Sequence, residues 1–511
     1  MTSERDGMSE QDVSEEALGL AARVFARFDE EGIAYCHWKS NDHLGAAMAG
    51  DTDLDVLVDA ERMDHAYAVL SELGCRRARV ATARNEPGLE DFFGVDPREG
   101  KLVHFHTHWR LATGERHLKR FRLPWEKLVL DTRVRDEDTG TYVTAPAAEV
   151  VLCALRAALK LRWRDRARLA VTRRPPTSLR DELAWLMKGT DEEQVRDVAE
   201  RWLGEQGAAA VVRCVVEGAS VPSLEHLHHV ARRRLCTQAS HASAPAALVR
   251  WRREVAWFQR GVARHYAPRP VLYGRGGGAG GLIVAVLGAD GSGKSTLVGD
   301  LRRWFAPKFD TYPVYFGSGD GPASLLRLPL NLARRCLLGS KEVVARKNAE
   351  RDSDPSRPSG GIATSKAVWA LTLAHEKHRK LGRAMRARTR GLLVITDRWP
   401  QNQVQGSTDG PLLGTWRTSR NPLRRWLAAV EARPYEAAER FPPDLVLRLR
   451  VDPTTAAGRR PEHGEHYLAG RIDIVNSLVF PEARFGVVEL DATAPYSTVL
   501  DQALRAAFSR I

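Results

Sequence analysis

Several features are scarce in this chain, and each scarcity excludes a class of protein. Only six cysteines occur in 511 residues, and no two of them form a Cys-x-x-Cys pair (Cys36, Cys75, Cys153, Cys214, Cys236 and Cys336). This spacing argues against a disulfide framework or a zinc ribbon and favours reduced thiols in a cytoplasm. No apolar run approaches the roughly 20 residues that span a bilayer, and the polar, acid-containing first residues argue against a secretory signal. We therefore expect a cytoplasmic protein without membrane insertion.

Acidic residues are outnumbered, since 77 Lys and Arg face 64 Asp and Glu and leave a formal net charge of +13. The basic residues are spread along the chain, however. The densest stretch, residues 156–174, alternates Arg and Lys with Leu, Ala and Trp at helical spacing. No aromatic stacking motif accompanies it, so a solvated helix face or attraction to a small polyanion is favoured over nucleic-acid binding. The oligomeric state stays open, with a homodimer as one option.

The length of the chain predicts two to four domains. A glycine-rich stretch at 274–281 separates two regions of different composition, and we interpret it as part of a flexible linker. The predicted organisation is an α+β domain at 1–145, a helical subdomain at 146–270, a linker at 271–281 and an α/β domain at 282–511.

The strongest motif follows the apolar run at 282–287. Residues 288–296 read Gly-Ala-Asp-Gly-Ser-Gly-Lys-Ser-Thr, which is the P-loop pattern between a strand and a helix. Its glycines let the backbone N–H groups wrap around a polyphosphate, Lys294 adds a positive charge, and the Ser295 hydroxyl can bind Mg²⁺. The motif predicts ATP and Mg²⁺ as cofactors. The residues expected to hold the nucleotide are Gly288, Gly291, Ser292, Gly293, Lys294, Ser295 and Thr296.

Strands and helices alternate in the rest of the C-terminal half. We expect strands at 312–316, 392–398, 445–451 and 486–490, helices at 295–304 and 367–390, and a mobile polar loop at 339–361. This order predicts a doubly wound parallel sheet with ligands at the carboxyl ends of its strands. Asp397 ends one such strand and would help Ser295 to hold Mg²⁺.

Three segments of this half together resemble the thymidylate kinases. They are the loop with Asp290 at 288–296, Asp397-Arg398-Trp399, and the segment 443–453 followed by Arg459 and Arg460. The resemblance implies a kinase in which Asp290 faces the phosphoryl acceptor and Arg398 binds the acceptor's phosphate. It also implies that Arg459 and Arg460 belong to a lid that closes over the transferring group.

The same half departs from that family near the acceptor. His375-Glu376-Lys377 stands where the family has Ala-Asp-Arg, Trp399 is bulkier than the usual Tyr, and residues 400–402 and 409–411 do not match the thymine pocket. We therefore expect a small, already phosphorylated nucleotide or sugar as acceptor, rather than thymidylate.

The N-terminal half predicts a helix at 14–31 and strands at 33–38, 53–58 and 102–111. Asp53 and Asp55 alternate on one strand and would lie on one face, where two carboxylates can share a divalent cation. His104, His106 and His108 alternate in the same way on the last strand. They could complete a metal site with the two acids, or be half-buried strand histidines without a ligand.

This arrangement resembles the nucleotidyltransferase superfamily, and the helix-rich stretch from 147 to 265 resembles the helical subdomain that follows such a core. Two positions depart from the pattern, because Lys39 replaces the first Gly of its turn and His106 stands in place of a third Asp. The half could therefore be a metal site or a substrate-binding domain without catalysis.

Three functions remain open from the sequence. The leading hypothesis is an ATP- and Mg²⁺-dependent small-molecule kinase, with Lys294, Asp290, Asp397, Arg398, Arg459 and Arg460 as its catalytic residues. The first alternative is nucleotidyl transfer to a sugar or antibiotic by the N-terminal half. The second is a non-enzymatic switch that responds to bound nucleoside triphosphate.

Overall fold

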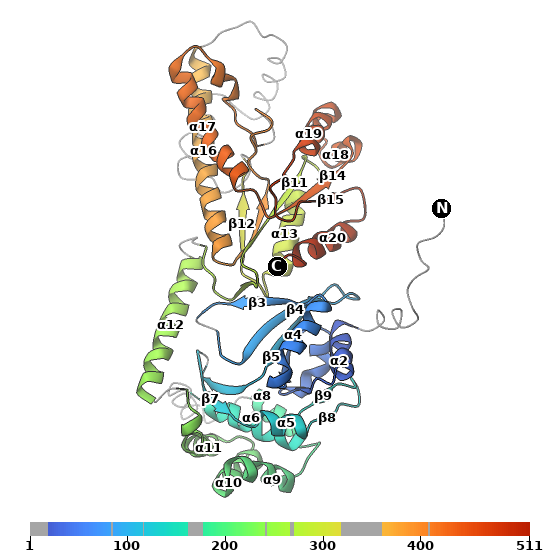
Figure 1. The fold of residues 1–511 in the computed structure, drawn as a ribbon, viewed down its shortest axis with the longest axis vertical. Helices are drawn as coiled ribbons and strands as arrows, with labels where there is room; N and C mark the ends of the chain where they lie inside the picture. Colours follow the sequence, from blue (N-terminus) through green and yellow to red (C-terminus); the bar gives the residue numbers. More distant parts are fainter. Residues whose placement is uncertain are drawn as a thin grey trace, which may run out of the picture. The chain divides into compact units, whose positions relative to one another are not determined.

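The computed structural model describes residues 19–82, 85–115, 117–161, 177–240, 243–265, 270–317, 360–406 and 409–511. The chain divides into two compact units, Met1–Val262 and Ala263–Ile511, each of which is described by itself (Figure 1). Most of the tract expected to be mobile, 339–359, lies outside the described residues, and so does most of the basic stretch, from 162 onward. Gly360 and Gly361 of that tract instead begin a helix.

The N-terminal unit is built on a mixed sheet whose strands run in the order β3-β4-β5-β2-β1-β9-β8. These strands are β1 (Tyr35–His37), β2 (Asp53–Val58), β3 (Arg76–Val80), β4 (Leu89–Val95), β5 (Leu102–His108), β8 (Val134–Arg135) and β9 (Tyr142–Val143). A separate hairpin pairs β6 (Leu111–Glu115) with β7 (Leu118–Leu123). Strands β2 and β5 are parallel, which places Asp53 opposite His104 and Asp55 opposite His106. The sheet thus brings together the acids and histidines that the sequence singles out.

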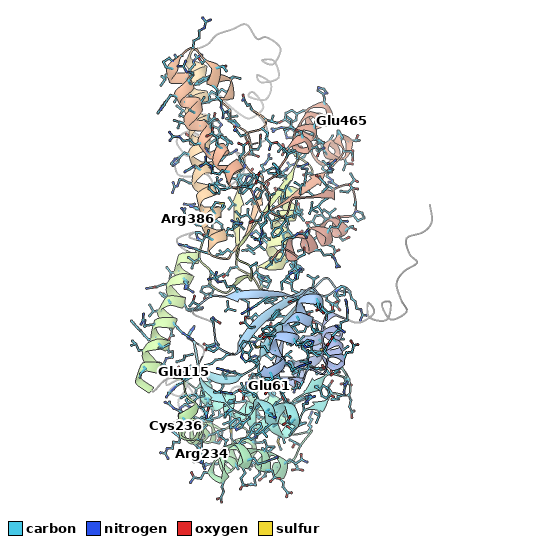
Figure 2. The ribbon with its side chains drawn as sticks, in the orientation of Figure 1. Glu61, Glu115, Arg234, Cys236, Arg386 and Glu465 are labelled. Atoms are coloured by element: carbon cyan, nitrogen blue, oxygen red, sulfur yellow. The ribbon has the colours of Figure 1, made fainter. Side chains whose placement is uncertain are left out.

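Helices cover this sheet and extend beyond it. Those before the hairpin are α2 (Leu20–Glu30), α3 (Leu44–Met48) and α4 (Met63–Glu72), and those after it are α5 (Glu126–Asp131), α6 (Pro146–Lys160), α8 (Thr177–Leu186), α9 (Glu192–Leu203), α10 (Glu205–Val216), α11 (Val221–Arg234) and α12 (Ser243–His265). Helix α6 is buried along most of its length and shares one core with the strand residues Cys36 and Leu57, with Trp38 just after β1, and with α8 to α11. Side chains fill the interior of each unit, and the exposed Cys236 follows α11 (Figure 2).

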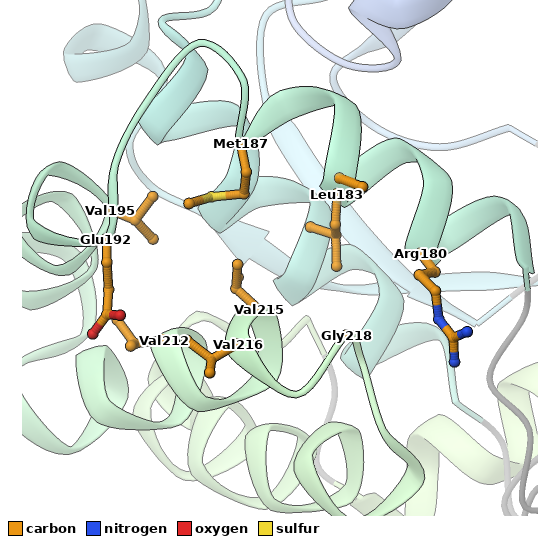
Figure 3. Close-up of a pocket in the computed structure, with 10 residues that line it drawn as sticks. Arg180, Leu183, Met187, Glu192, Val195, Val212, Val215, Val216 and Gly218 are labelled. Atoms are coloured by element: carbon orange, nitrogen blue, oxygen red, sulfur yellow. The ribbon is translucent and has the colours of Figure 1, made fainter.

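A small apolar pocket lies between α8, α9 and α10 (Figure 3). Its volume is about 310 Å³, and it is lined mainly by Leu183, Met187, Val195, Val212 and Val215. Arg180 and Glu192 are the charged residues of its lining. Nothing in this pocket provides converging polar groups for catalysis.

The C-terminal unit has an α/β fold, as the sequence predicts. Its five strands run in the order β12-β13-β11-β14-β15, and every neighbouring pair is parallel. They are β11 (Leu282–Gly288), β12 (Thr311–Tyr315), β13 (Leu393–Asp397), β14 (Leu445–Arg450) and β15 (Val487–Asp491). Strand β11 is central and buried along its whole length. A strand buried on both faces reads as a continuous apolar run, which is why residues 282–287 carry so clear a signal.

Helices cover both faces of this sheet. They are α13 (Lys294–Phe305), α16 (Gly360–Thr389), α17 (Pro422–Arg440), α18 (Pro453–Arg459), α19 (Glu465–Ser477) and α20 (Tyr496–Phe508). Ile283, Ala285 and Leu287 of β11 share a core with α16 and α19, whereas α13 and α20 contact each other and are not part of that core. Because alternate strand residues point to opposite faces, α13 and α20 cover the other face.

The glycine-rich stretch at 274–281 is not a flexible linker, and that interpretation was wrong. It contains a short strand, β10 (Arg275–Gly277), and the Tyr273 and Gly274 amides each donate to Asp310 Oδ2 at 2.6 Å. A Cβ on Gly276 would lie 2.0 Å from the Gly391 carbonyl oxygen. Glycine is needed here for close backbone packing rather than for freedom. Over the described residues, no helix is both long and apolar enough to cross a membrane.

Candidate nucleotide-binding site

The loop between β11 and α13 has the backbone conformation that its glycines permit. Gly291 and Gly293 adopt left-handed φ values of 85° and 88°. A Cβ on Gly288 would lie 2.3 Å from Ser292 Oγ, and one on Gly291 would lie 2.7 Å from the carbonyl oxygen of Ala456. The loop therefore wraps tightly at the first turn of α13, where backbone N–H groups and the helix dipole favour an anion.

Lys294 is buried at the start of α13, with 6% of its surface exposed. Its ammonium donates to the carbonyl oxygen of Ala289 at 2.7 Å and lies 3.6 Å from Asp290 Oδ1. Burial lowers the pKa of Lys294 to about 8, with the nearby Arg398 acting in the same direction. The side chain is thus charged at neutral pH and held inside the loop, where it can move from a backbone carbonyl to a phosphate oxygen.

Ser295 and Asp397 provide oxygen ligands suited to Mg²⁺. The Ser295 hydroxyl donates to Asp397 Oδ2 at 2.8 Å, and Asp397 is 6% exposed at the end of β13. In the part of the chain that the structure describes, the buried Asp397 Oδ1 has no hydrogen-bond partner. A buried carboxylate oxygen without a partner is costly unless a cation or water satisfies it. The two side chains therefore fit the magnesium site that the sequence predicts.

Arg398 follows Asp397 directly and is held in an uncommon conformation. Its φ is 70°, and the Thr396 hydroxyl donates to its carbonyl oxygen at 2.9 Å. The guanidinium donates to Asp290 Oδ1 at 2.8 Å and to Asp409 Oδ2 at 3.4 Å. Burial alone would lower the pKa of Arg398, but Asp409 and Asp290 outweigh it and raise that pKa. A left-handed conformation in a non-glycine residue at a cleft is typical of a functional site.

One cleft of about 960 Å³ contains all of these groups. Asp290, Lys294, Ser295, Asp397 and Arg398 line it, as do Gly291, Gly293 and Thr296 of the loop. Gly288 and Ser292 lie beneath the loop rather than in the lining, because Ser292 is only 2% exposed and packs against Gly288.

The two expected lid arginines both line this cleft but differ in their contacts. Arg459 ends α18 and donates to the carbonyl oxygens of Gly291 at 3.4 Å and Ala492 at 2.9 Å. Arg460 forms an exposed ion pair with Glu462 at 3.1 Å. Arg459 is therefore already in contact with the loop, whereas Arg460 faces solvent.

Sequence reasoning missed a buried ion pair in the same cleft. Lys377 of α16 is 5% exposed, and its ammonium donates to the Asp409 carbonyl oxygen at 2.9 Å and to Asp409 Oδ1 at 3.2 Å. Burial lowers the pKa of Lys377, and Asp409 opposes that shift. The sequence shows Lys377 only as one of many basic residues on a long helix. The one feature that distinguishes it in the sequence is that Lys377 stands in the segment where the thymidylate kinases have Ala-Asp-Arg.

Trp399 does not line the cleft, and the use of residues 399–402 to describe the acceptor pocket was wrong. Trp399 is 2% exposed, packs against Phe316 with ring centres 5.3 Å apart, and donates from Nε1 to the Ala438 carbonyl oxygen at 3.3 Å. Gln401 is also buried and bonds the backbone of Val404. Asp409 and Gly410, by contrast, do lie in the cleft lining.

The second group of candidate residues lies in the N-terminal unit. Asp55 Oδ1 is 3.0 Å from His106 Nδ1, 3.4 Å from His108 Nε2 and 2.7 Å from the Lys39 ammonium. Burial would raise the pKa of Asp55, but Lys39 and the two histidines hold it well below its usual range. Burial also lowers the pKa of both histidines, so both imidazoles are neutral at pH 7.

Asp53 lies in a different pairing from Asp55. Its Oδ1 is 2.8 Å from His104 Nδ1, and the other nitrogen of this fully buried histidine is 2.6 Å from Asp91 Oδ1. Asp91 comes from β4 and is 1% exposed. The sequence gives no signal for this third carboxylate. Asp91 is one of two adjacent acids at the start of β4, Glu90 and Asp91, and only the strand order brings it next to β5.

The loop, the parallel sheet and the cleft together define a P-loop α/β unit. No protein-family model matches the chain. Two proteins of Escherichia coli strain K12, the uncharacterized ATP-binding protein YghR and the uncharacterized ATP-binding protein YghS, are each 32% identical to it, over 234 and 229 residues. Each match spans 44% of this chain, and 86% and 91% of the respective relatives. Over this part, the chain belongs to the family of YghR and YghS.

Proposed function

We propose that this protein is an ATP- and Mg²⁺-dependent phosphotransferase of the thymidylate-kinase type, acting on a small acceptor that already carries a phosphate. One observation carries this proposal: the nucleotide groups Lys294 and Ser295 and the acceptor groups Asp290 and Arg398 line the same cleft. YghR and YghS are named as ATP-binding proteins, which supports ATP as the nucleotide.

The donor side of the cleft would act by positioning and charge. Backbone N–H groups of the loop bind the phosphates, and Lys294 moves its ammonium from Ala289 to the β- and γ-phosphate oxygens. Ser295 and Asp397 would hold Mg²⁺, which neutralises charge on the β- and γ-phosphates. Arg459 lies close enough to the loop to stabilise the transferring group.

The acceptor side is organised by Arg398. Its guanidinium is held by Asp290 and Asp409, and an acceptor phosphate would replace part of these contacts with a charge-assisted, bidentate one. Asp290 has its pKa lowered: burial alone would raise it, but Arg398 and Lys294 outweigh that effect. It is therefore ionised at neutral pH and can accept a hydrogen bond from a hydroxyl group of the acceptor, which orients the acceptor toward the γ-phosphate.

Product analysis tests this proposal against its two alternatives. We would incubate the full chain with ATP, Mg²⁺ and a panel of nucleoside monophosphates and sugar phosphates, and measure ADP and the phosphorylated acceptor, which is a diphosphate where a phosphate attacks and a phosphoester where a hydroxyl attacks. Acceptor-dependent ADP supports the kinase. Pyrophosphate release in its place would support nucleotidyl transfer, and nucleotide binding without turnover on any acceptor would support a switch.

Thymidylate itself should be a poor acceptor. The cleft contains the buried Lys377–Asp409 pair, and both residues lie in segments that depart from the thymidylate kinases, so the groups that would face an acceptor base differ from those of a thymine pocket. We expect kcat/KM for dTMP to fall well below roughly 10⁴ M⁻¹s⁻¹, which is the lower end of the range for enzymes acting on their own substrates. A coupled ADP assay at neutral pH measures this value, and efficient dTMP phosphorylation would contradict the prediction.

The proposed Mg²⁺ ligand can be tested by replacing the hydroxyl of Ser295. Ser295→Ala removes one oxygen ligand and leaves Asp397 Oδ2 without its 2.8 Å donor, so the Mg²⁺ concentration for half-maximal activity should rise about tenfold or more. Ser295→Thr retains the hydroxyl and is the matched control, with near-normal Mg²⁺ dependence. Equal Mg²⁺ curves for the Ala and Thr variants would rule out Ser295 as a ligand.

A further inference from the structure

A compact set of nitrogen and oxygen ligands that the proposed kinase chemistry does not use lies on β2 and β5 of the N-terminal unit. One ligand atom each from Asp55, His106 and His108 lies within 4.8 Å of the other two. The parallel register fixes this arrangement, because Asp55 is paired with His106 and His108 stands two residues further along the same strand. Side chains at i and i+2 on a strand share a face, so both imidazoles meet the carboxylate.

We propose that Asp55, His106 and His108 form a binding site for one divalent transition metal ion of the zinc class. Two imidazole nitrogens and a carboxylate are the ligand types that Zn²⁺ and its neighbours prefer, whereas Mg²⁺ prefers oxygen alone. Ligand atoms around one such ion lie roughly 3.0–3.4 Å apart, given bond lengths of about 2.1 Å. The distances from Asp55 Oδ1 to the two histidine nitrogens, 3.0 and 3.4 Å, are of this size.

A buried carboxylate lies behind the ligands, on the far side of His106. The second nitrogen of His106, Nε2, faces the buried Asp91 Oδ1 at 3.7 Å. Asp91 is fixed in turn by His104 at 2.6 Å. A histidine that points one nitrogen at a metal and the other toward a carboxylate is the usual arrangement in metal sites. Three protein ligands leave a further position for water or for a bound molecule.

The Lys39 ammonium competes with a metal ion for the Asp55 carboxylate. It lies 2.7 Å from Asp55 Oδ1, the same oxygen that faces both histidines, and also 5.0 Å from the centre of the Trp38 ring. A metal ion would displace the ammonium from the carboxylate, while the contact with Trp38 gives the side chain another place to remain. Removal of the Lys39 charge should therefore tighten metal binding. If Lys39 and Asp55 formed only a structural ion pair, with no metal site beside it, the same substitution would not increase metal affinity.

The test uses the full chain, freed of metal with a chelator, and titrates Zn²⁺ by calorimetry and Co²⁺ by visible absorption without nucleotide. Cys236, which is exposed, and Cys336 are replaced by Ser in every sample, because thiols bind the same metals. His106→Gln with His108→Gln should weaken Zn²⁺ binding by at least about 100-fold, since both imidazole ligands are lost. His65→Gln is the matched control, because His65 is an exposed histidine of the same unit that pairs with Glu31.

Lys39→Met keeps the proposal testable even if the histidine variant folds poorly, because it retains all three ligands and is expected to gain affinity rather than lose it. We expect Lys39→Met to bind Zn²⁺ at least about tenfold more tightly, as an adjacent positive charge is removed. Binding of Zn²⁺ that is equal in the parent, the double histidine variant and Lys39→Met would overturn the proposal. So would an absence of any binding to both the parent and Lys39→Met.

Discussion

Lys294→Ala should reduce ATP-dependent phosphoryl transfer by at least about 100-fold. The substitution removes a buried ammonium that the loop holds ready, 2.7 Å from a backbone carbonyl oxygen, next to where charge develops on the transferring group. Removal of one such preorganised donor commonly costs 10²- to 10³-fold in kcat. Because Lys294 is charged at neutral pH, its loss also weakens the binding of ATP. Initial rates of ADP formation at saturating acceptor measure the effect.

The matched control for this prediction is Arg302→Ala. Arg302 is an exposed residue in the last turn of α13, the helix that Lys294 begins, and it does not line the cleft. The substitution therefore changes the net charge equally and should leave the rate unchanged. If Lys294→Ala retained the turnover of the parent protein while folded, the P-loop would not be the catalytic site.

The C-terminal fold could be predicted from sequence because its signals are local. The pattern of residues 282–296 predicts a strand, a tight loop and the start of a helix, in that order. In the structure, β11 and α13 begin and end within about one residue of the predicted boundaries. The parallel sheet is likewise confirmed. The structure formed by an apolar run followed by glycines depends little on distant parts of the chain. Such a pattern can therefore be interpreted before the fold is known.

The errors concern long-range packing. The stretch 274–281 has the composition of a linker, but its glycines are required by the backbone of Gly391 and Arg388, more than a hundred residues away. Trp399 directly follows Arg398, which lines the cleft, yet the Trp399 side chain packs into the core, where Phe316 provides an apolar contact and the Ala438 carbonyl oxygen accepts its hydrogen bond. No pattern within a short window contains these partners.

The candidate site divides in the same way. Lys294, Ser295 and Asp397 were predicted from the motif and a strand end, and the structure brings them together in one cleft. Lys377 and Asp409 could not be predicted, because their pairing needs α16 and the loop before α17 to meet. In the N-terminal unit, the spacing of Asp55, His106 and His108 suggested one face, but the strand register decides which acid meets which histidine.

Replacement of Arg398 should impair the binding and phosphorylation of the acceptor and leave the binding of ATP unchanged. Arg398→Ala removes a guanidinium that Asp290 and Asp409 orient toward the cleft, so it should raise the acceptor KM and lower kcat, with an unchanged KM for ATP. A lost charge-assisted contact to a phosphate costs roughly 2–3 kcal/mol, or about 30- to 150-fold in kcat/KM for the acceptor. Steady-state kinetics with each substrate varied in turn separate the two effects.

Two further variants make this result specific to the guanidinium. Arg398→Lys has the same Cβ at a φ of 70°, so backbone strain is matched, but a point charge cannot form the bidentate contact. It should recover part of the lost kcat/KM. Arg386→Ala removes an exposed arginine outside the cleft, labelled in Figure 2, and should have no effect. If Arg398→Ala changed the KM for ATP as much as that for the acceptor, Arg398 would serve the nucleotide, and the acceptor would bind elsewhere in the cleft.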